Sequence, residues 1–202
     1  MDTIRRGSLD RRNDCFTRLR ATMDSNSQSA ELSRQADMIA FRSLRPDDCV
    51  DVLRINAAAG PAVFRLDPPE LSRLTRISSL HLVAVRDDDA IAGYALAFSS
   101  DDPYDGQEFL AFRASIAEPF WYVDQIAVES RLRSMGVGRM LYEALVSGAS
   151  LRGVTAICCE VNTTPPNADS LAFHRRLAFE RVGTLGTFDG REVALLRRST
   201  NV

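Results

Sequence analysis

The feature that most constrains the fold is an apolar run that passes through a short glycine-containing turn directly into an amphipathic segment. The run, residues 120–128, has the length and the apolar, aromatic content of a strand. The segment after the turn carries apolar or small residues at the spacing of one helical face: Val137, Met140, Leu141, Ala144, Leu145 and Gly148. This strand–turn–helix unit predicts a domain that combines a sheet with helices.

Further apolar runs on both sides of this unit predict a mixed α/β fold. The expected strands are residues 39–44, 81–86, 91–98, 154–161, 181–188 and 191–197. The expected helices begin near Pro46, near Pro68, around Glu108 and after Asn167, whose side chain can cap the first turn. In chain order this is β-α-α-β-β-(α)-β-α-β-α-β-β, which predicts a single mixed α/β domain over residues 38–202.

The N-terminal residues 1–37 differ from the rest of the chain. They contain seven Arg and six acidic residues, with scarcely any apolar periodicity. Such a segment cannot bury a face of its own. We therefore expect a flexible N-terminal extension at 1–37.

The charge composition excludes several classes of function. The 25 basic residues of this 202-residue chain are all Arg, and 27 acidic residues give a net charge of −2. Without Lys the chain has no ε-amine for a P-loop, a Schiff base or a pyridoxal enzyme. A chain with a pI near 5.7 is not typical of nucleic-acid binding. No apolar stretch approaches the ~18 residues of a membrane span, so we expect a soluble, cytoplasmic protein without membrane or nucleic-acid partners.

The four cysteines suggest neither a metal site nor a disulfide framework. No C-x-x-C pair occurs among Cys15, Cys49, Cys158 and Cys159. The adjacent pair lies in the apolar run 154–161, where small thiols are typical of a core and inert toward substrates. We expect no metal and no cysteine nucleophile.

The glycine turn has the features of an anion-binding site. Residues 133–139 read R-S-M-G-V-G-R and open a helix, whose first N–H groups and positive dipole end attract phosphate. No third glycine follows Gly138 at the spacing of the G-x-G-x-x-G dinucleotide fingerprint. From these residues alone, a structural glycine turn and a site for a nucleotide phosphate both remain open.

Two motifs together resemble the GNAT superfamily of acyl-CoA-dependent N-acyltransferases. The family motif V-x-x-x-x-Q/R-x-x-G-x-G/A is matched by Val128, Arg133, Gly136 and Gly138. The family also has a later strand and an Asn that opens a helix ending in aromatic-x-x-x-G-F, and residues 158–179 are similar to this segment. The element order fits over residues 39–198.

The resemblance implies a fold and a co-substrate. The fold is GNAT-like, with flanking helices and a mostly antiparallel central sheet in which strands 120–128 and 154–161 are parallel and splay apart. The co-substrate is acetyl-CoA, held in the cleft between these strands. The residues expected to contact it are Ile126, Val128, Arg133, Ser134, Met135, Gly136, Val137, Gly138, Arg139, Asn167 and Ser170. Main-chain N–H groups at 135–139 would bind the phosphates, and those at 126–128 the thioester carbonyl.

Three departures from the family pattern bear on this expectation. Ser130 and Ser134 stand where Pro and Gly are frequent, and we expect both changes to be tolerated. Ala178 replaces the usual Gly at the end of the second motif, which implies that this position does not need a positive φ. His174 occupies the place where many members carry a Tyr that resembles a general acid.

Two acidic residues are candidates for the general base that an attacking ammonium group needs. Asp124 lies in an otherwise apolar strand, on the face expected for Tyr122 and Ile126, and such surroundings raise the pKa of a carboxyl toward neutrality. Glu160, near the end of the next strand, is the competing candidate. For either residue, a hydrogen bond to strand-end backbone is the simpler interpretation.

His174 also has two interpretations. It shares a helical face with Ser170 and Leu177, where a packed, hydrogen-bonded histidine is common. Alternatively it protonates the leaving thiolate, with Arg175 and Arg176 favouring its neutral form.

Three polar features lie outside these candidates. Asn167 caps its helix, contacts the pantetheine arm of CoA, or does both. The acidic loop 101–106 is most simply a solvated turn, and it would favour a cationic amine if it overhangs the cleft. Asn56, at the end of the first helix's apolar face, is a weaker candidate for acceptor binding.

The expected function is transfer of an acetyl group from acetyl-CoA to the primary amine of a small molecule or peptide, by direct attack in a ternary complex. The alternative is a non-catalytic acyl-CoA-binding regulatory module on the same fold, which would keep the phosphate cradle and lack the base. The hairpin at 181–197 offers a pairing edge, so a homodimer is one possible assembly.

Overall fold

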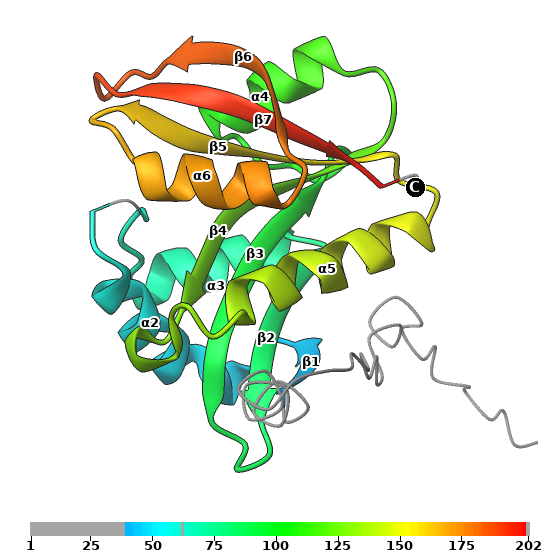
Figure 1. The fold of residues 1–202 in the computed structure, drawn as a ribbon. Coiled ribbons are helices and arrows are strands. Elements are labelled where there is room, and N and C mark those ends of the chain that lie inside the picture. The colour runs from blue at the N-terminus through cyan, green and yellow to red at the C-terminus, as the bar shows by residue number, and fades with distance from the viewer. Residues whose placement is uncertain (1–38, 62, 201–202) are drawn as a thin grey trace, which may run out of the picture.

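The computed structural model describes residues 39–61 and 63–200, which form one sheet of seven strands with helices on both faces (Figure 1). The strands are β1 (Ile39–Ser43), β2 (Leu80–Arg86), β3 (Ile91–Ser99), β4 (Phe120–Val128), β5 (Ala156–Thr164), β6 (Glu180–Gly186) and β7 (Glu192–Ser199). The helices are α2 (Cys49–Ala59), α3 (Pro68–Ile77), α4 (Gln107–Ser115), α5 (Val137–Ser150) and α6 (Ala168–Arg176), with 3-10 turns η1 (Pro46–Asp48) and η2 (Ser130–Leu132). The extension expected at 1–37 lies outside the described residues.

The sheet has the mixed topology predicted from the sequence. Its strand order is β1-β2-β3-β4-β5-β7-β6. Only β4 and β5 are parallel among the described neighbours, and the other pairs are antiparallel. The parallel pairing begins with Phe120 opposite Ala156 and ends with Val123 opposite Cys159. Beyond this point the two strands diverge, as Figure 1 shows, which confirms the expected splay.

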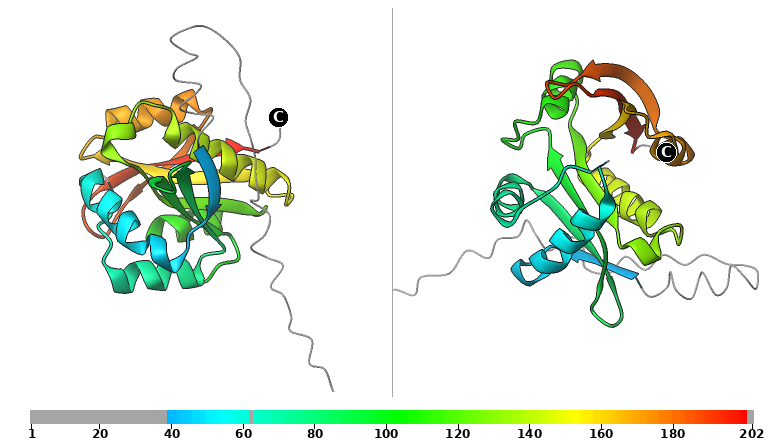
Figure 2. Two further views of the ribbon diagram at one scale, coloured as in Figure 1. Left: turned by 90° about the horizontal axis from the view of Figure 1, so that it is seen from below. Right: turned by 90° about the vertical axis from the view of Figure 1, so that its left-hand side faces the viewer.

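Each face of the sheet is covered by its own set of helices (Figure 2). Helices α5 and α6 pack on one face, in a buried cluster that includes Leu82, Val123, Leu141, Leu145 and Leu177. Helices α2, α3 and α4 pack on the other, in a cluster that includes Val52, Leu74, Tyr94, Phe112 and Tyr122. The two layers hold β4 and β5 rigidly up to the point where they separate.

A β-bulge in β4 changes the expected orientation of its polar residues. Val123 pairs with Ala97 and Gln125 pairs with Leu96, so Asp124 is an extra residue on β4. The alternation of side chains is shifted there. Tyr122 packs with the α2–α4 layer, whereas Ile126 packs against the α5–α6 layer. The expectation that Asp124 shares one face with both residues was therefore wrong for Ile126.

Two non-glycine positions of the family motifs adopt the left-handed backbone region that glycine favours, as does Asp89 in the β2–β3 turn. Ala178 has φ 61°, so the expectation that this position needs no positive φ was wrong. The reason is the end of α6, where Phe179 N donates to His174 O over 3.0 Å and the chain turns sharply into β6. Ser134 has φ 65°, so a Ser at this family glycine position also carries a backbone cost.

The predicted start of α6 is confirmed, since Asn167 Oδ1 accepts a hydrogen bond from Ser170 N at 3.2 Å.

In the described part of the chain, no helix combines the length and the apolar character that crossing a membrane requires.

Candidate active site

The glycine turn between β4 and α5 exposes backbone N–H groups. Gly136 is the N-cap of α5, with φ 87° and no side-chain cap. The first hydrogen bond of the helix runs from Met140 N to Gly136 O over 2.9 Å. The N–H groups of Val137, Gly138 and Arg139 precede this bond, so they lack the usual intrahelical acceptor. The turn thus has the geometry of an anion-binding helix start.

The two glycines of this turn differ in the space beside them. A Cβ built on Gly136 would have nothing within 4 Å, so this glycine is needed for its positive φ rather than for space. A Cβ on Gly138 would make ordinary contacts, with Phe173 at 3.5 Å and Val128 at 3.7 Å. The missing side chain at Gly138 therefore leaves room for a group that approaches the backbone closely, as a phosphate does.

Two arginines brace the turn against α2. Arg133 Nη2 donates to Ala58 O over 2.9 Å, at the last turn of that helix. Arg54 of α2 pairs with Glu129, the residue before η2, over 2.5 Å. Arg139 is exposed in the first turn of α5. Arg133 thus has a structural partner, and contact of either Arg133 or Arg139 with phosphate stays a prediction.

A cavity of about 370 Å³ opens where β4 and β5 separate. The predicted site residues that line it are Asp124, Ile126, Glu160, Asn167, Ser170 and His174. The others, Val128 and residues 133–139, are not part of its lining and belong to the strand end and the turn that follows it. The fold therefore gathers the acid–base candidates in one cavity, at the splay between the parallel strands.

Asp124 carries a carboxyl with a raised pKa in this cavity. Burial raises the pKa of Asp124 to about 6, and a hydrogen bond from Tyr104 counteracts part of the rise. The Tyr104 hydroxyl donates to Asp124 Oδ1 over 2.5 Å. The Tyr104 ring is stacked on Phe98 with centroids 3.9 Å apart, which holds the hydroxyl in position.

Glu160 lies beside Asp124 in the same cavity. The Tyr122 hydroxyl donates to Glu160 Oε2 over 2.7 Å. Burial, and then the charge of Asp124, raise the pKa of Glu160 to about 8. The main partner of each carboxyl is thus a phenol, not the strand-end backbone of the simpler interpretation. The two carboxyls titrate as a coupled pair in which Asp124 ionises first.

His174 is buried between helices and has a partner at each ring nitrogen. Its Nδ1 lies 2.8 Å from Ser170 O, an acceptor, so Nδ1 carries the proton. Its Nε2 lies 2.8 Å from the Tyr142 hydroxyl and therefore accepts from it. Burial lowers the pKa of His174, and neither Arg175 nor Arg176 is a cause. This geometry matches the packed, hydrogen-bonded interpretation.

Cys158 and Cys159 are 0% and 2% exposed, on opposite faces of β5. Burial raises the pKa of both thiols, to about 12 for Cys158. Both residues are thus core thiols, as expected.

The acidic loop 101–106, before α4, is partly buried, in contrast to the expected solvated turn. Asp102 is 7% exposed and accepts hydrogen bonds from the backbone N of Ser79 and Ser99 at 2.8 and 2.9 Å. Tyr104 of the same loop reaches Asp124. Tyr104 thus forms part of the cavity wall, whereas Asp101 and Asp105 are exposed as expected of a solvated turn. The signal for the wall was a single Tyr among acidic residues.

A buried amide network fixes the opposite wall. Asn56 donates to Gln125 Oε1 at 3.0 Å and to Phe64 O at 3.0 Å, and it accepts from Leu66 N at 2.8 Å. Gln125 also donates to Phe64 O, at 3.1 Å. Asn56 is 2% exposed, so it holds the α2–α3 connection against β4 and is not an acceptor-binding residue on the cavity surface.

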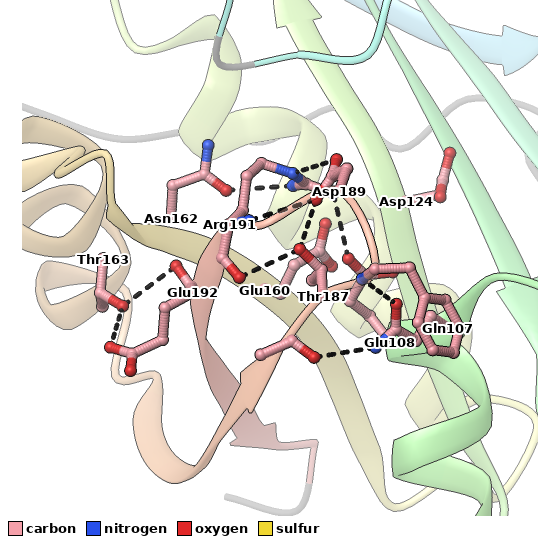
Figure 3. A network of polar contacts seen from close by, with 12 residues as sticks. Gln107, Glu108, Asp124, Glu160, Asn162, Thr163, Thr187, Asp189, Arg191 and Glu192 are labelled. Carbon is pink, nitrogen blue, oxygen red and sulfur yellow. Dashed lines mark hydrogen bonds and ion pairs between the residues drawn. The ribbon is translucent and has the colours of Figure 1, made fainter.

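A third wall comes from the connection between β6 and β7 (Figure 3). Arg191 pairs with Asp189 at 2.7 Å and with Glu108 of α4 at 3.3 Å, and donates to Asn162 Oδ1 of β5 at 3.1 Å. Gln107 of α4 accepts from Phe188 N at 3.0 Å. These residues are distant in sequence and follow no motif, so only the fold reveals them as neighbours.

Comparison with known proteins agrees with the fold. The acetyltransferase (GNAT) family model matches residues 50–179. The ribosomal-protein alanine N-acetyltransferase of Escherichia coli is 19% identical, over 82% of this chain and 96% of that chain, with a TM-score of 0.59. Ard1 from Thermoplasma volcanium is 19% identical, over 80% of this chain and 97% of that chain, with a TM-score of 0.62.

Arabidopsis thaliana Naa50, in complex with the bisubstrate analogue CoA-Ac-MVNAL, is 15% identical, over 80% of this chain and 99% of that chain, with a TM-score of 0.60. No match was found among curated proteins. At these identities the solved structures establish the shared fold, and the family model, which spans more than half of the chain, establishes the family. The chain belongs to the GNAT acetyltransferase family and is an acyltransferase.

Proposed function

We propose that this acyltransferase moves an acetyl group from acetyl-CoA to the primary amine of a small molecule or peptide, by direct attack within a ternary complex. The observation that carries the proposal is the Asp124 carboxyl, which lies in the cavity at the point where β4 leaves β5. A base here can accept the proton of an attacking ammonium group while the glycine turn between β4 and α5 holds the acetyl donor.

The residues of the glycine turn fit the pyrophosphate of acetyl-CoA. Backbone N–H groups of Val137, Gly138 and Arg139 bind its oxygens, and Gly138 leaves room for close approach. Met135 N already donates to Leu132 O over 3.3 Å. Arg139 is exposed at the helix start and adds a charge-assisted hydrogen bond. The CoA-containing analogue bound by Naa50, which shares the fold, supports this donor. Asn167 and Ser170, which line the cavity, are assigned to the pantetheine arm.

Asp124 is the general base, and Glu160 is not. With a pKa of about 6, Asp124 is mostly ionised at neutral pH. The pKa of Glu160, about 8, keeps Glu160 mostly protonated there. In the reaction the N–C bond forms and the C–S bond breaks. The ammonium nitrogen loses two protons: one passes to Asp124, and the other goes to the sulfur, which leaves as the thiol. His174, whose Nε2 has no proton to donate, orients Tyr142 instead.

The test of this function combines titration calorimetry with acetyl-CoA and a thiol-release assay on a panel of amines. Binding with amine-dependent thiol release supports the proposal. Binding without release on any amine identifies the alternative, a non-catalytic acyl-CoA-binding regulatory module. Affinity for ATP or NAD that acetyl-CoA does not displace identifies a nucleotide-phosphate site instead.

The variant Asp124→Asn tests the base. We expect kcat to fall about 10²–10⁴-fold, the usual contribution of a general base, while acetyl-CoA binding is unchanged. The control is Asp101→Asn, which removes an exposed carboxyl outside the cavity. Full activity of Asp124→Asn would refute the assignment.

A further inference from the structure

Acidic side chains outnumber basic ones in the lining of the cavity. Over residues 39–61 and 63–200, four carboxyls and one guanidinium line it: Glu108, Asp124, Glu160, Asp189 and Arg191. The carboxyls come from α4, β4, β5 and the β6–β7 connection, so acidic groups face the cavity from several sides, and Glu160 becomes charged when a cation lies beside it. Such a cavity attracts cations and repels an acceptor that carries a carboxylate.

Arg191 does not neutralise the carboxyls of Asp124 and Glu160. Its Nε pairs with Asp189 at 2.7 Å, and its two terminal nitrogens are engaged by Glu108 at 3.3 Å and Asn162 at 3.1 Å (Figure 3). All three guanidinium nitrogens therefore have partners on the wall itself. Within the described part of the chain, neither Asp124 nor Glu160 has an ion-pair partner within 4.0 Å.

Asp124 and Glu160 place two separate carboxyl groups in the same cavity. Each is the residue directly after the last paired position of its strand, where Val123 lies opposite Cys159. The charge of Asp124 raises the pKa of Glu160, so the two carboxyls are near enough to interact although they share no partner. Each accepts from its own phenol, Tyr104 for Asp124 and Tyr122 for Glu160.

We propose that the acceptor is an aliphatic diamine or polyamine, with its reacting amine at Asp124 and a second ammonium group paired with Glu160. This inference rests on the proposed function, because it names the acceptor class of the same site. A monoamine would satisfy only one of the two carboxyls. An amino acid would bring a carboxylate to a cavity whose guanidinium is already engaged.

The titration of Glu160 is consistent with its pairing to an ammonium group. Without a cation, Glu160 holds its proton, because burial and the charge of Asp124 raise its pKa to about 8. The charged and titratable groups that interact with it come from several elements around the cavity: Tyr104, Glu108, Tyr122, Asp124, Tyr142, Cys159 and Arg191. An ammonium group beside Glu160 lowers this pKa. Binding of a diamine at neutral pH therefore releases a proton from the Glu160 carboxyl to the buffer.

The first arm of the test compares acceptors of matched length. The full chain with acetyl-CoA is assayed for thiol release on 1,4-diaminobutane, n-butylamine, 4-aminobutanoate and a peptide with a free N-terminus and no basic side chain. We expect kcat/KM for the diamine, halved for its two equivalent amines, to exceed that for n-butylamine at least about ten-fold. The 4-aminobutanoate should be slowest. Equal or faster transfer to n-butylamine or the peptide would overturn the proposal.

The second arm removes the assigned partner of the distal ammonium group. Glu160→Gln keeps a hydrogen-bond acceptor for Tyr122 and removes the charge. We expect the diamine-to-monoamine ratio of kcat/KM to fall at least about five-fold. Asp47→Asn, an exposed carboxyl on η1 outside the cavity, is the charge-matched control and leaves the ratio unchanged. An unchanged ratio in Glu160→Gln would contradict the pairing.

Calorimetry on the CoA-saturated protein separates failure of the site from failure of the chemistry. Proton release is measured by repeating the titration in two buffers. Tighter binding of 1,4-diaminobutane than of n-butylamine, with proton release, supports the diamine site. If no thiol is released in that case, only the proposed function fails. Transfer to other amines without preference for the diamine leaves the function standing and refutes this inference. Neither preferential binding nor turnover refutes both.

Discussion

The Tyr104 hydroxyl donates a hydrogen bond to Asp124 Oδ1 over 2.5 Å, joining the loop before α4 to the bulge of β4. This bond stabilises the ionised carboxylate, whereas burial opposes ionisation. The pKa of Asp124, about 6, is the balance of the two effects. The working pH of the base is thus controlled by a residue outside the motifs of the family.

Replacing this phenol therefore shifts the pH dependence of the reaction. In Tyr104→Phe the ring stack on Phe98 is retained and the hydrogen bond is lost. A hydrogen bond to a charged group contributes about 1.5–3 kcal/mol, so the pKa of Asp124 should rise by about 1–2 units. We expect the acid limb of the kcat/KM profile to move to higher pH by that amount. An unmoved limb with wild-type activity would show that Asp124 does not act as the base.

The buried pair also makes folding stability depend on pH. Glu160 titrates near 4.5 when unfolded and near 8 when folded, so the native state binds more protons between these values. Stability therefore falls as pH rises through this window and levels off above it. Glu160→Gln abolishes the Glu160 contribution, so between pH 5.5 and pH 9 it should lose about 3 kcal/mol less stability than wild type, at about 1.4 kcal/mol per pKa unit.

Urea unfolding at the two pH values measures this difference. The matched control is Glu180→Gln, on the exposed edge strand β6, which should keep the wild-type dependence on pH. If Glu160→Gln and wild type lose equal stability between the two pH values, the Glu160 carboxyl does not hold a proton in the folded protein.

The elements of this fold were predictable from the sequence because local patterns specify them. The period of apolar residues predicted α5, and the apolar run 120–128 predicted β4 with its observed bounds. The cap at Asn167 was equally local, since it needs only the first turn of α6. Wherever a signal extends over a few neighbouring residues, a single sequence is sufficient to predict the structure.

The walls of the cavity were not predictable, because they depend on contacts between residues that are distant in the chain. The bulge at Asp124 depends on the register of β4 against β3, which no local pattern reveals. Asn56 carried a visible polar signal, yet its partner Gln125 is 69 positions away. Tyr104 and Arg191 likewise find their partners only through the arrangement of the strands.

The two glycines of the turn should respond differently to alanine. Gly136→Ala forces a Cβ onto a residue with φ 87°, which costs about 1–2 kcal/mol of stability. Gly138→Ala introduces an ordinary contact with Phe173 at 3.5 Å in a helix and should be neutral or stabilising by up to about 1 kcal/mol. The added methyl group fills the space assigned to phosphate, so we expect acetyl-CoA to bind Gly138→Ala at least about ten-fold more weakly. Calorimetry and thermal unfolding measure both effects, and wild-type affinity in Gly138→Ala would refute the cradle.

The last turn of α6 offers a prediction independent of any ligand. Ala178 has φ 61°, a conformation that costs an L-residue about 1–2 kcal/mol, and glycine adopts it freely at an entropic cost of about 0.5–1 kcal/mol. Ala178→Gly should therefore stabilise the protein by about 0.5–1 kcal/mol in urea unfolding. The matched control is Ala172→Gly, within the same helix, where the same chemical change should destabilise by about 1 kcal/mol. Opposite signs at the two positions would identify backbone strain at Ala178 as the cause, whereas destabilisation by both variants would show that the left-handed turn carries no strain that glycine can relieve.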